Sequence, residues 1–124
     1  MNFLLVDDDE IFNMLNRKLL EKMGIAKNVR TANNGKEAML LFQQHYVKND
    51  VTPDFIFLDL NMPVMDGFEF LKQFQKMSSH GGSTKVVIVS SSCDPRDITR
   101  ARECGADHYI VKPVSEEKLK KLFS

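Results

Sequence analysis

The sequence predicts an α/β domain built on a parallel sheet, and three observations support this prediction. Short apolar runs alternate with segments of helical periodicity from end to end, five of each kind, which is the pattern of repeated βα units. The runs are rich in β-branched and aromatic residues, as strands buried on both faces are. A chain of 124 residues has room for one core and not for two. We therefore expect residues 1–124 to form one domain.

Five segments are expected to be strands, namely residues 2–6, 28–32, 54–58, 85–89 and 108–111. The third is almost wholly apolar and lies between Pro53 and Pro63, which favours a central position in the sheet. In an open α/β sheet the chemistry gathers beyond the carboxyl ends of the strands. The polar residues that follow these runs are therefore the first candidates for a functional site.

The first two helices are expected between the first three strands. Apolar residues recur at helical spacing in the first, at Ile11, Leu15, Leu19 and Met23. Gly24 follows where a left-handed cap would end this helix. The second is expected to begin at Asn34, a residue type that caps helices. Its inward side chains are expected to be Ala38, Leu41 and Phe42.

The remaining three helices have equally clear signals. The third carries an apolar stripe made of Phe68, Phe70, Leu71, Phe74 and Met77. The fourth is expected to follow Asp94 as its N-cap, because Pro95 suits the first turn of a helix. The fifth begins at Ser115 and contains Leu119 and Leu122.

Composition excludes several classes of function. Seventeen basic and seventeen acidic residues give a formal net charge of zero, so we expect no direct binding of nucleic acid. The first apolar run, residues 3–6, is too short for a signal peptide or a membrane span, so we expect a cytoplasmic protein without membrane contact. The two cysteines and three histidines lack metal-ligand spacing, and the thiols are expected to be free.

Acidic residues follow two of the expected strands. Asp7 and Asp8 come directly after the first, and Asp59 comes directly after the third. If these strands are neighbours, the carboxylates meet in one crevice, where each like-charge pair at about 4 Å costs roughly 4 kcal/mol at an effective dielectric of about 20. The cluster therefore needs a cation, and a hard divalent ion such as Mg²⁺ suits oxygen ligands.

A hydroxyl and an ammonium are expected at the same edge. Ser90 follows the fourth strand and Lys112 follows the fifth. Both groups suit the oxygens of a phosphate. An aspartate becomes a competent nucleophile toward phosphorus once a metal ion and a lysine neutralise the surrounding charge. The residues together indicate a carboxylate, Asp59, that accepts a phosphoryl group.

Over its whole length the sequence resembles the receiver domains of two-component response regulators. The matching residues are Val6-Asp7-Asp8, Asn34-Gly35, Asp59-Leu60-Asn61-Met62-Pro63, Asp66-Gly67, Ser90, Gly105-Ala106, Tyr109 and Lys112-Pro113. Signatures at all five strand ends, in order, make a chance match improbable. The resemblance implies the flavodoxin-like or CheY-like (βα)5 fold, a three-layer sandwich whose parallel sheet has the strand order 2-1-3-4-5.

The resemblance also implies roles for the acidic residues. Asp59 is expected to be the phosphoacceptor and, with Asp8, a direct ligand of Mg²⁺. Asp7 is expected to bind the metal largely through water, and Asn61 to bind it with its backbone carbonyl. Mn²⁺ is an expected substitute for Mg²⁺.

Three further residues have roles that the resemblance implies. Ser90 is expected to be a switch hydroxyl that closes onto the phosphoryl group, and Lys112 the ammonium that pairs with it. Tyr109 is expected to turn inward after Ser90 has moved. The peptide bond between Lys112 and Pro113 is expected to be cis. Ser92 occupies a position that tunes the lifetime of the phosphoryl group in this family.

The implied function is that of a phosphoacceptor receiver in a two-component system or phosphorelay. A histidine kinase or a histidine phosphotransfer protein donates the phosphoryl group. The domain is expected to catalyse only its own phosphorylation and dephosphorylation and otherwise not to be an enzyme. A downstream protein is expected to bind the surface of the fourth helix, fifth strand and fifth helix. Basic residues recur on these helices, either as a solvated charged face or as a basic rim that helps to select a partner, and they are Arg96, Arg100, Arg102, Lys118, Lys120 and Lys121.

Three other functions fit parts of the pattern. A small Mg²⁺-dependent aspartyl-phosphate phosphatase of the haloacid dehalogenase type is suggested by Asp7 and Asp9, but Ile11 stands where Thr or Val is expected. A flavodoxin-type electron carrier would need a hydroxyl-rich loop after the first strand, where this chain has acids. A receiver-like domain that binds partners without phosphate would lack acids or the lysine that are all present here.

Overall fold

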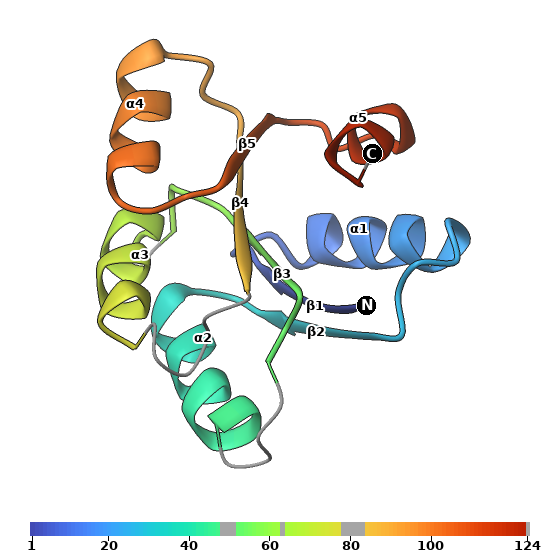
Figure 1. The fold of residues 1–124 in the computed structure, drawn as a ribbon, viewed down its shortest axis with the longest axis horizontal. Helices are drawn as coiled ribbons and strands as arrows, with labels where there is room; N and C mark the ends of the chain where they lie inside the picture. Colours follow the sequence, from blue (N-terminus) through green and yellow to red (C-terminus); the bar gives the residue numbers. More distant parts are fainter. Residues whose placement is uncertain (48–51, 63, 78–83, 124) are drawn as a thin grey trace.

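Five parallel strands form one sheet with the order β2-β1-β3-β4-β5 (Figure 1). The architecture is taken from a computed structural model that describes residues 1–47, 52–62, 64–77 and 84–123. The strands are β1 (Asn2–Val6), β2 (Asn28–Ala32), β3 (Phe55–Leu58), β4 (Lys85–Ser90) and β5 (His108–Val111). Each lies within one residue of its expected bounds, and the strand order is the expected one.

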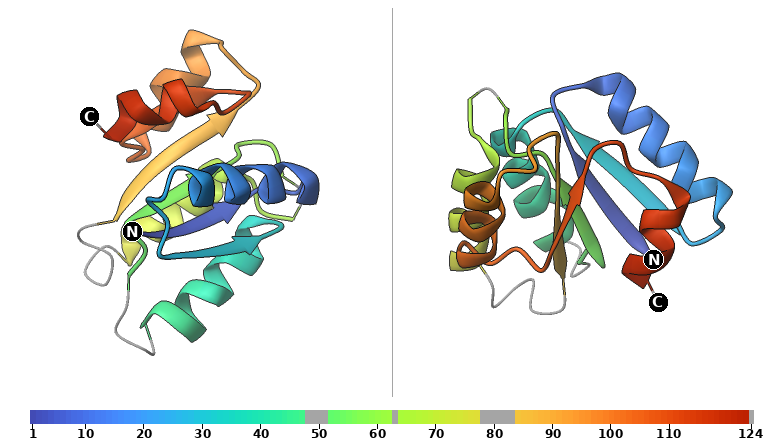
Figure 2. Two further views of the ribbon diagram at one scale, coloured as in Figure 1. Left: turned by 90° about the vertical axis from the view of Figure 1, so that its right-hand side faces the viewer. Right: turned by 90° about the horizontal axis from the view of Figure 1, so that it is seen from above.

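Five α-helices cover the sheet. They are α1 (Glu10–Lys22), α2 (Gly35–Leu41), α3 (Gly67–Lys76), α4 (Pro95–Glu103) and α5 (Glu116–Phe123). Helices α1 and α5 lie on one face, and α2, α3 and α4 lie on the other (Figures 1 and 2). The three-layer α/β fold is therefore confirmed. The π-helical segment η1 (Phe42–Val47), which continues α2, was not indicated by the sequence.

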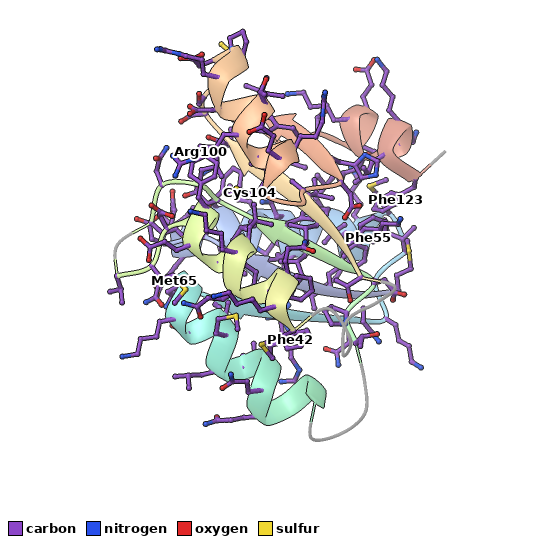
Figure 3. The ribbon with its side chains drawn as sticks, turned by 60° about the vertical axis from the view of Figure 1, so that its left-hand side comes forward. Phe42, Phe55, Met65, Arg100, Cys104 and Phe123 are labelled. Carbon is purple, nitrogen blue, oxygen red and sulfur yellow. The ribbon has the colours of Figure 1, made fainter. Side chains whose placement is uncertain are left out.

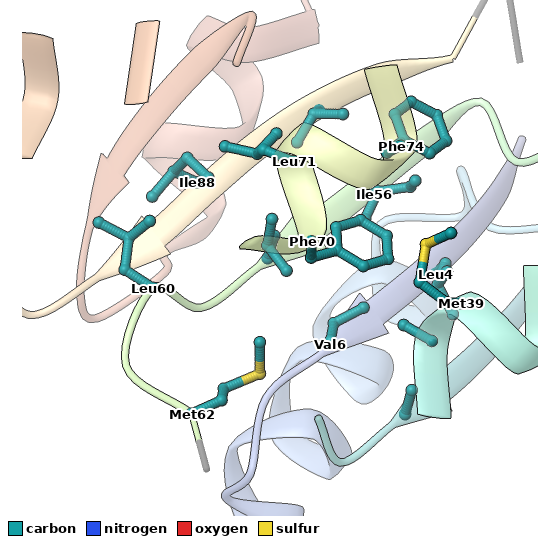
Figure 4. Close-up of a cluster of buried hydrophobic side chains, with 14 of the residues drawn as sticks. Leu4, Val6, Met39, Ile56, Leu60, Met62, Phe70, Leu71, Phe74 and Ile88 are labelled. Carbon is teal, nitrogen blue, oxygen red and sulfur yellow. The ribbon is translucent and has the colours of Figure 1, made fainter. Parts of the chain in front are cut away.

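Each face of the sheet has its own apolar core. On one face, α3 places Phe70, Leu71 and Phe74 against strand residues such as Ile56 and Ile88 (Figure 4). These five side chains are at most 3 % exposed. Because the strands are apolar on both sides, they read as continuous hydrophobic runs in the sequence.

The second core lies under α1 and α5. Leu20 of α1 and Leu119 of α5 are fully buried there. Aromatic rings pack at the periphery of this core, among them Phe55 and Phe123 (Figure 3). The centroids of these two rings are 5.1 Å apart. The two cores hold the strands in one register, so the residues that follow the strands emerge together at the carboxyl edge.

Short polar side chains cap all five of the described α-helices, and at α5 the Ser115 hydroxyl accepts a hydrogen bond of 3.2 Å from the Lys118 N–H. Asp9, Asn34, Asp66 and Asp94 each accept hydrogen bonds from backbone N–H groups of the first turn of α1, α2, α3 and α4. Such caps satisfy donors that have no partner within the helix. The predicted caps Asn34 and Asp94 are confirmed. Gly24 follows α1 with φ of 71°, a left-handed conformation that favours glycine.

The apolar pattern predicted for α1 faces the core only in the second half of the helix, where Leu19 and Met23 are partly buried and pack against it. Ile11 and Leu15 are 65 % and 54 % exposed, whereas Asn13 and Asn16 are buried. The Asn13 amide donates a hydrogen bond of 3.0 Å to the backbone carbonyl of Asp7. Polar residues are buried here because this part of α1 packs over the polar end of β1, where a backbone acceptor needs a partner.

Within the part of the chain that the structure describes, no helix has both the length and the apolar character needed to span a membrane.

Candidate functional site

Strand pairing brings the predicted acids together. Strands β1 and β3 are neighbours, with Val6 opposite Leu58, and the Asp59 N–H donates to the Val6 carbonyl at 2.9 Å. One carboxylate oxygen from each of Asp7, Asp8 and Asp59 lies within 4.8 Å of the other two. Asp7 and Asp59 are buried and Asp8 is exposed, so the cluster opens to solvent at Asp8.

The pKa of Asp59 is raised from 3.8 to about 6. Burial of the carboxyl group is the main cause, and the neighbouring charge of Asp7 adds to it, with a smaller contribution from Asp8. Lys112 and the N–H of Asn61, which lies 3.4 Å from Asp59 Oδ1, act in the opposite direction. The ionised form of Asp59 is therefore costly, and a cation beside it would stabilise that form.

The ammonium of Lys112 lies among these acids. Its Nζ is 2.9 Å from Asp7 Oδ2 and 3.9 Å from Asp59 Oδ2. The backbone holds the residue in place, because the Lys112 N–H donates to the Ser90 carbonyl at 2.8 Å. The peptide bond to Pro113 is cis, the isomer expected from the resemblance.

The donor set fits a hard divalent cation. The clustered groups of Asp7, Asp8 and Asp59 are all carboxylates, and Mg²⁺ and Ca²⁺ prefer oxygen ligands. Burial is the main cause of the raised pKa of Asp59, and the charges of Asp7 and Asp8, which raise it further, are charges that such an ion would balance. Asn61, the expected backbone ligand, follows Asp59 in the loop after β3.

Helix α3 begins directly on the backbone of the acidic site. A Cβ atom on Gly67 would lie 2.5 Å from the Asp59 carbonyl oxygen and 2.8 Å from Leu60 Cα. The Gly67 N–H donates to the Leu60 carbonyl at 3.0 Å. Glycine is therefore required here for close approach, which explains the Asp66-Gly67 motif in physical terms.

Ser90 and Tyr109, the two expected switch residues, are connected through Ser92. The Ser92 N–H donates to Ser90 Oγ at 3.1 Å, and the Tyr109 hydroxyl donates to the Ser92 carbonyl at 2.8 Å. The Ser92 hydroxyl also donates to Asp97 of α4 at 2.6 Å. Ser92 thus joins the end of β4 to both β5 and α4.

Tyr109 was expected to turn inward when the site is phosphorylated. In this structure its ring is already partly buried and packs against the core under α3 and α4. The hydrogen bond to Ser92 accounts for this position, because it satisfies the hydroxyl of an otherwise apolar ring.

Sequence reasoning did not identify Phe12 or Asn13 as part of the site. Phe12 contacts Lys112, which lies a hundred positions later in the chain. A contact between residues so far apart cannot be predicted from a local sequence pattern. Asn13 had a weak signal, since it and Asn16 recur at helical spacing on one side of a helix. The connecting role of Ser92 depends on loop geometry and had no signal.

The fold is that of a known family of signalling domains. The family model for the response regulator receiver domain matches residues 3–124. The chain therefore belongs to the response regulator receiver domains of two-component systems, as expected. This membership favours a signalling receiver over the phosphatase alternative.

Relatives and solved structures agree with the family. The chain is 37 % identical over 117 residues to two-component response regulator ORR41 of Oryza sativa subsp. japonica, covering 94 % of this chain and 86 % of the relative. It is 31 % identical to the probable C4-dicarboxylate response regulator DctR of Priestia megaterium, again over 94 % of this chain, but it spans only 47 % of that relative. The structure of chemotaxis protein CheY4 of Vibrio cholerae superimposes with a TM-score of 0.82 at 31 % identity, covering 98 % of this chain and 94 % of the other.

Proposed function

We propose that residues 1–124 act as one receiver unit in the cytoplasm and that Asp59 is its phosphoacceptor. The donor is a histidine kinase or a histidine phosphotransfer protein. The observation that carries this proposal is the Asp59 carboxylate, whose pKa is raised mainly by burial and further by the charges of Asp7 and Asp8, and is lowered by Lys112. A buried acid held between like charges and one ammonium is suited to gain a phosphoryl group.

Each side chain has a distinct part in the transfer. A carboxylate oxygen of Asp59 forms a bond to phosphorus while the bond between phosphorus and the histidine nitrogen of the donor breaks. Lys112, 3.9 Å from Asp59, balances charge on the transferred oxygens. Asp7, Asp8, Asp59 and the Asn61 carbonyl would hold Mg²⁺, or Mn²⁺ in its place. The ion would supply charge neutralisation at the phosphoryl oxygens.

The same chemistry accounts for loss of the phosphoryl group. Water attacks the acyl phosphate on Asp59, and the products are the free carboxylate and inorganic phosphate. The domain therefore catalyses reactions of its own side chain and does not turn over a separate substrate.

The exposed apolar residues of α1 support a docking surface for the phosphodonor. Ile11, Met14 and Leu15 are 65 %, 46 % and 54 % exposed, and α1 begins directly after the acids of β1. A donor protein must approach Asp59 closely to transfer a phosphoryl group. Clustered exposed apolar side chains beside a reactive site are typical of a protein contact surface. We assign this surface, defined by Ile11, Met14 and Leu15, to the donor.

The surface of α4, β5 and α5 is the proposed output face. A groove of about 430 Å³ lies along β5 and α5, and Tyr109 and Lys118 are among its lining residues. Because Tyr109 also bonds to Ser92, a change at Ser90 can reach the wall of this groove. We propose that a downstream protein docks here.

The phosphoacceptor assignment can be tested with a small acyl phosphate in place of the protein donor. The wild-type protein is incubated with it and Mg²⁺, and the adduct is located by mass spectrometry. A single phosphoryl group on Asp59 is expected, with none in chelator. Asp59→Asn should not be modified, whereas Asp54→Asn, which changes an exposed acid just before β3, should behave as wild type. An adduct on another residue, or one formed equally in chelator, contradicts the assignment.

A further inference from the structure

The ammonium of Lys112 lies over an aromatic ring as well as beside the acids. Its Nζ is 4.2 Å from the centroid of the Phe12 ring. The same atom lies 2.9 Å from Asp7 and 3.9 Å from Asp59. The Lys112 side chain is 23 % exposed, so much of it is removed from water. The negative face of an aromatic ring attracts a cation at this distance, and the attraction is stronger when water is partly excluded.

The position of the Phe12 ring is fixed by its surroundings. Phe12 lies in the first turn of α1, where its N–H donates to Asp9 Oδ1, the cap of the helix, at 3.2 Å. The ring is partly buried and packs against the core under α1 and α5. It is therefore a rigid group, held in place by the same segment that supplies Asp7 and Asp8.

The Lys112 side chain, in contrast, is flexible by nature. A lysine ammonium is strongly hydrated and is carried on a stem with several rotatable bonds. Attraction to Asp7 alone would draw the ammonium away from Asp59, since Asp7 is the closer carboxylate. A second attractive group restricts the positions that the ammonium samples.

We propose that Phe12 is a positioning residue that holds the Lys112 ammonium at the acidic site before the phosphoryl group arrives. This inference rests on the proposed function of Asp59 as phosphoacceptor. Phe12 does not touch the reacting atoms and takes no part in the bond changes. It keeps the ammonium close to Asp59, so less side-chain freedom is lost when Lys112 pairs with the transferred oxygens.

The kinetic test separates the attraction of the ring from its volume. The variant Phe12→Leu keeps an apolar side chain without a ring, and Phe12→Tyr keeps the ring. Modification of Asp59 by a small acyl phosphate is expected to be about three- to tenfold slower in Phe12→Leu, the range that a partly desolvated cation–π contact implies. Phe12→Tyr should remain close to wild type. The matched control Phe123→Leu removes a ring that packs against the same core and should leave the rate unchanged.

A double-mutant cycle tests whether Phe12 acts through Lys112. Lys112→Met should itself be slow, and in this background adding Phe12→Leu should have no further effect on the rate. If Phe12→Leu slows the reaction by the same factor in both backgrounds, Phe12 shapes the site without acting on Lys112, and the proposal is wrong. A wild-type rate for Phe12→Leu alone overturns it as well.

A spectroscopic measurement tests the contact without any phosphoryl transfer. A ring shifts the NMR signals of protons lying over its face, so the Lys112 ε-protons of the metal-free protein should resonate away from their usual position. The shift should persist in Phe12→Tyr and vanish in Phe12→Leu. A wild-type protein that shows the shift but is not modified at Asp59 would contradict the proposed function and leave the contact supported. An unshifted signal in the wild type overturns the contact itself.

Discussion

The hydroxyl of Tyr109 donates a hydrogen bond of 2.8 Å to the backbone carbonyl of Ser92. The N–H of Ser92 in turn donates to Ser90 Oγ. If Ser90 rotates toward a phosphoryl group on Asp59, this N–H loses its acceptor. The loop between β4 and α4 must then rearrange, and Tyr109 is attached to that loop.

Replacing Ser90 with Ala should leave modification of Asp59 possible and weaken the response of α4 and β5. A charge-assisted hydrogen bond contributes about 1.5–3 kcal/mol, so its loss should lower the ratio of active to inactive protein about tenfold to a hundredfold. Amide chemical shifts of residues 96–104 and Tyr109, with and without a phosphoryl mimic, measure this response. Ser91→Ala changes an exposed neighbour and is the control. Equal perturbation in Ser90→Ala and wild type contradicts the role of Ser90.

The stability of the metal-free protein should depend on pH through Asp59. Its pKa is raised from 3.8 to about 6 in the folded protein, so between these values the folded state binds more protons than the unfolded state. Stability must therefore fall as pH rises through this window. Asp59→Asn removes the titrating group, so its advantage over the wild type in urea unfolding should be small at pH 4 and larger at pH 7. A difference that does not change with pH contradicts this prediction.

Gly67→Ala should destabilise the protein by about 1–3 kcal/mol, the usual cost of overpacking. The new Cβ atom would lie 2.5 Å from the Asp59 carbonyl oxygen and close to Leu60 Cα, and neither backbone atom can move freely. This cost outweighs the better helix propensity of Ala. Gly24→Ala is the comparison, because no atom lies within 4 Å of its added Cβ and only the left-handed backbone opposes it. The free energy of unfolding in urea should be lower for Gly67→Ala, and equal values would refute close packing at Gly67.

The proposed donor surface on α1 can be tested apart from the chemistry. Leu15→Ala should slow phosphoryl transfer from a protein donor by about fivefold or more, the cost expected of a contact residue that matters. It should leave modification by a small acyl phosphate unchanged. Leu40→Ala on α2, where Leu40 is 46 % exposed, is a matched control and should affect neither rate. If Leu15→Ala leaves the protein donor's rate unchanged, the donor does not dock on this surface.

Much of the fold could be predicted because its signals are local. Short apolar runs give the strands, and capping residues such as Asn34 and Asp94 fix helix starts within a turn. The sequence could also place Asp7, Asp8 and Asp59 together, since parallel strands end at one edge. The strand order itself came from the family resemblance and not from the chain's own pattern.

Other features depend on contacts between distant residues. At the start of α1 the apolar pattern indicated the wrong buried face, because such a pattern assumes an apolar neighbour and the end of β1 instead presents a backbone carbonyl to Asn13. The ring of Phe12 under Lys112 requires the three-dimensional closeness of α1 and the end of β5. The link from Ser90 to Tyr109 passes through the backbone N–H and carbonyl of Ser92, groups that nearly all residues have, so the side chain of Ser92 could not reveal it.

The packing of Gly67 against Asp59 constrains how the domain can transmit a signal. The Asp59 main chain is held on one side by the Val6 carbonyl and on the other by the start of α3. The backbone at Asp59 therefore cannot shift to accommodate new charge on the Asp59 side chain. We expect the adjustment to fall on polar groups at the carboxyl ends of β4 and β5 that can rotate, chiefly the Ser90 hydroxyl and the Lys112 ammonium. If Asp59 is the phosphoacceptor, as proposed, a backbone that is fixed at this position would direct the effect of phosphorylation toward the surface of α4 and β5.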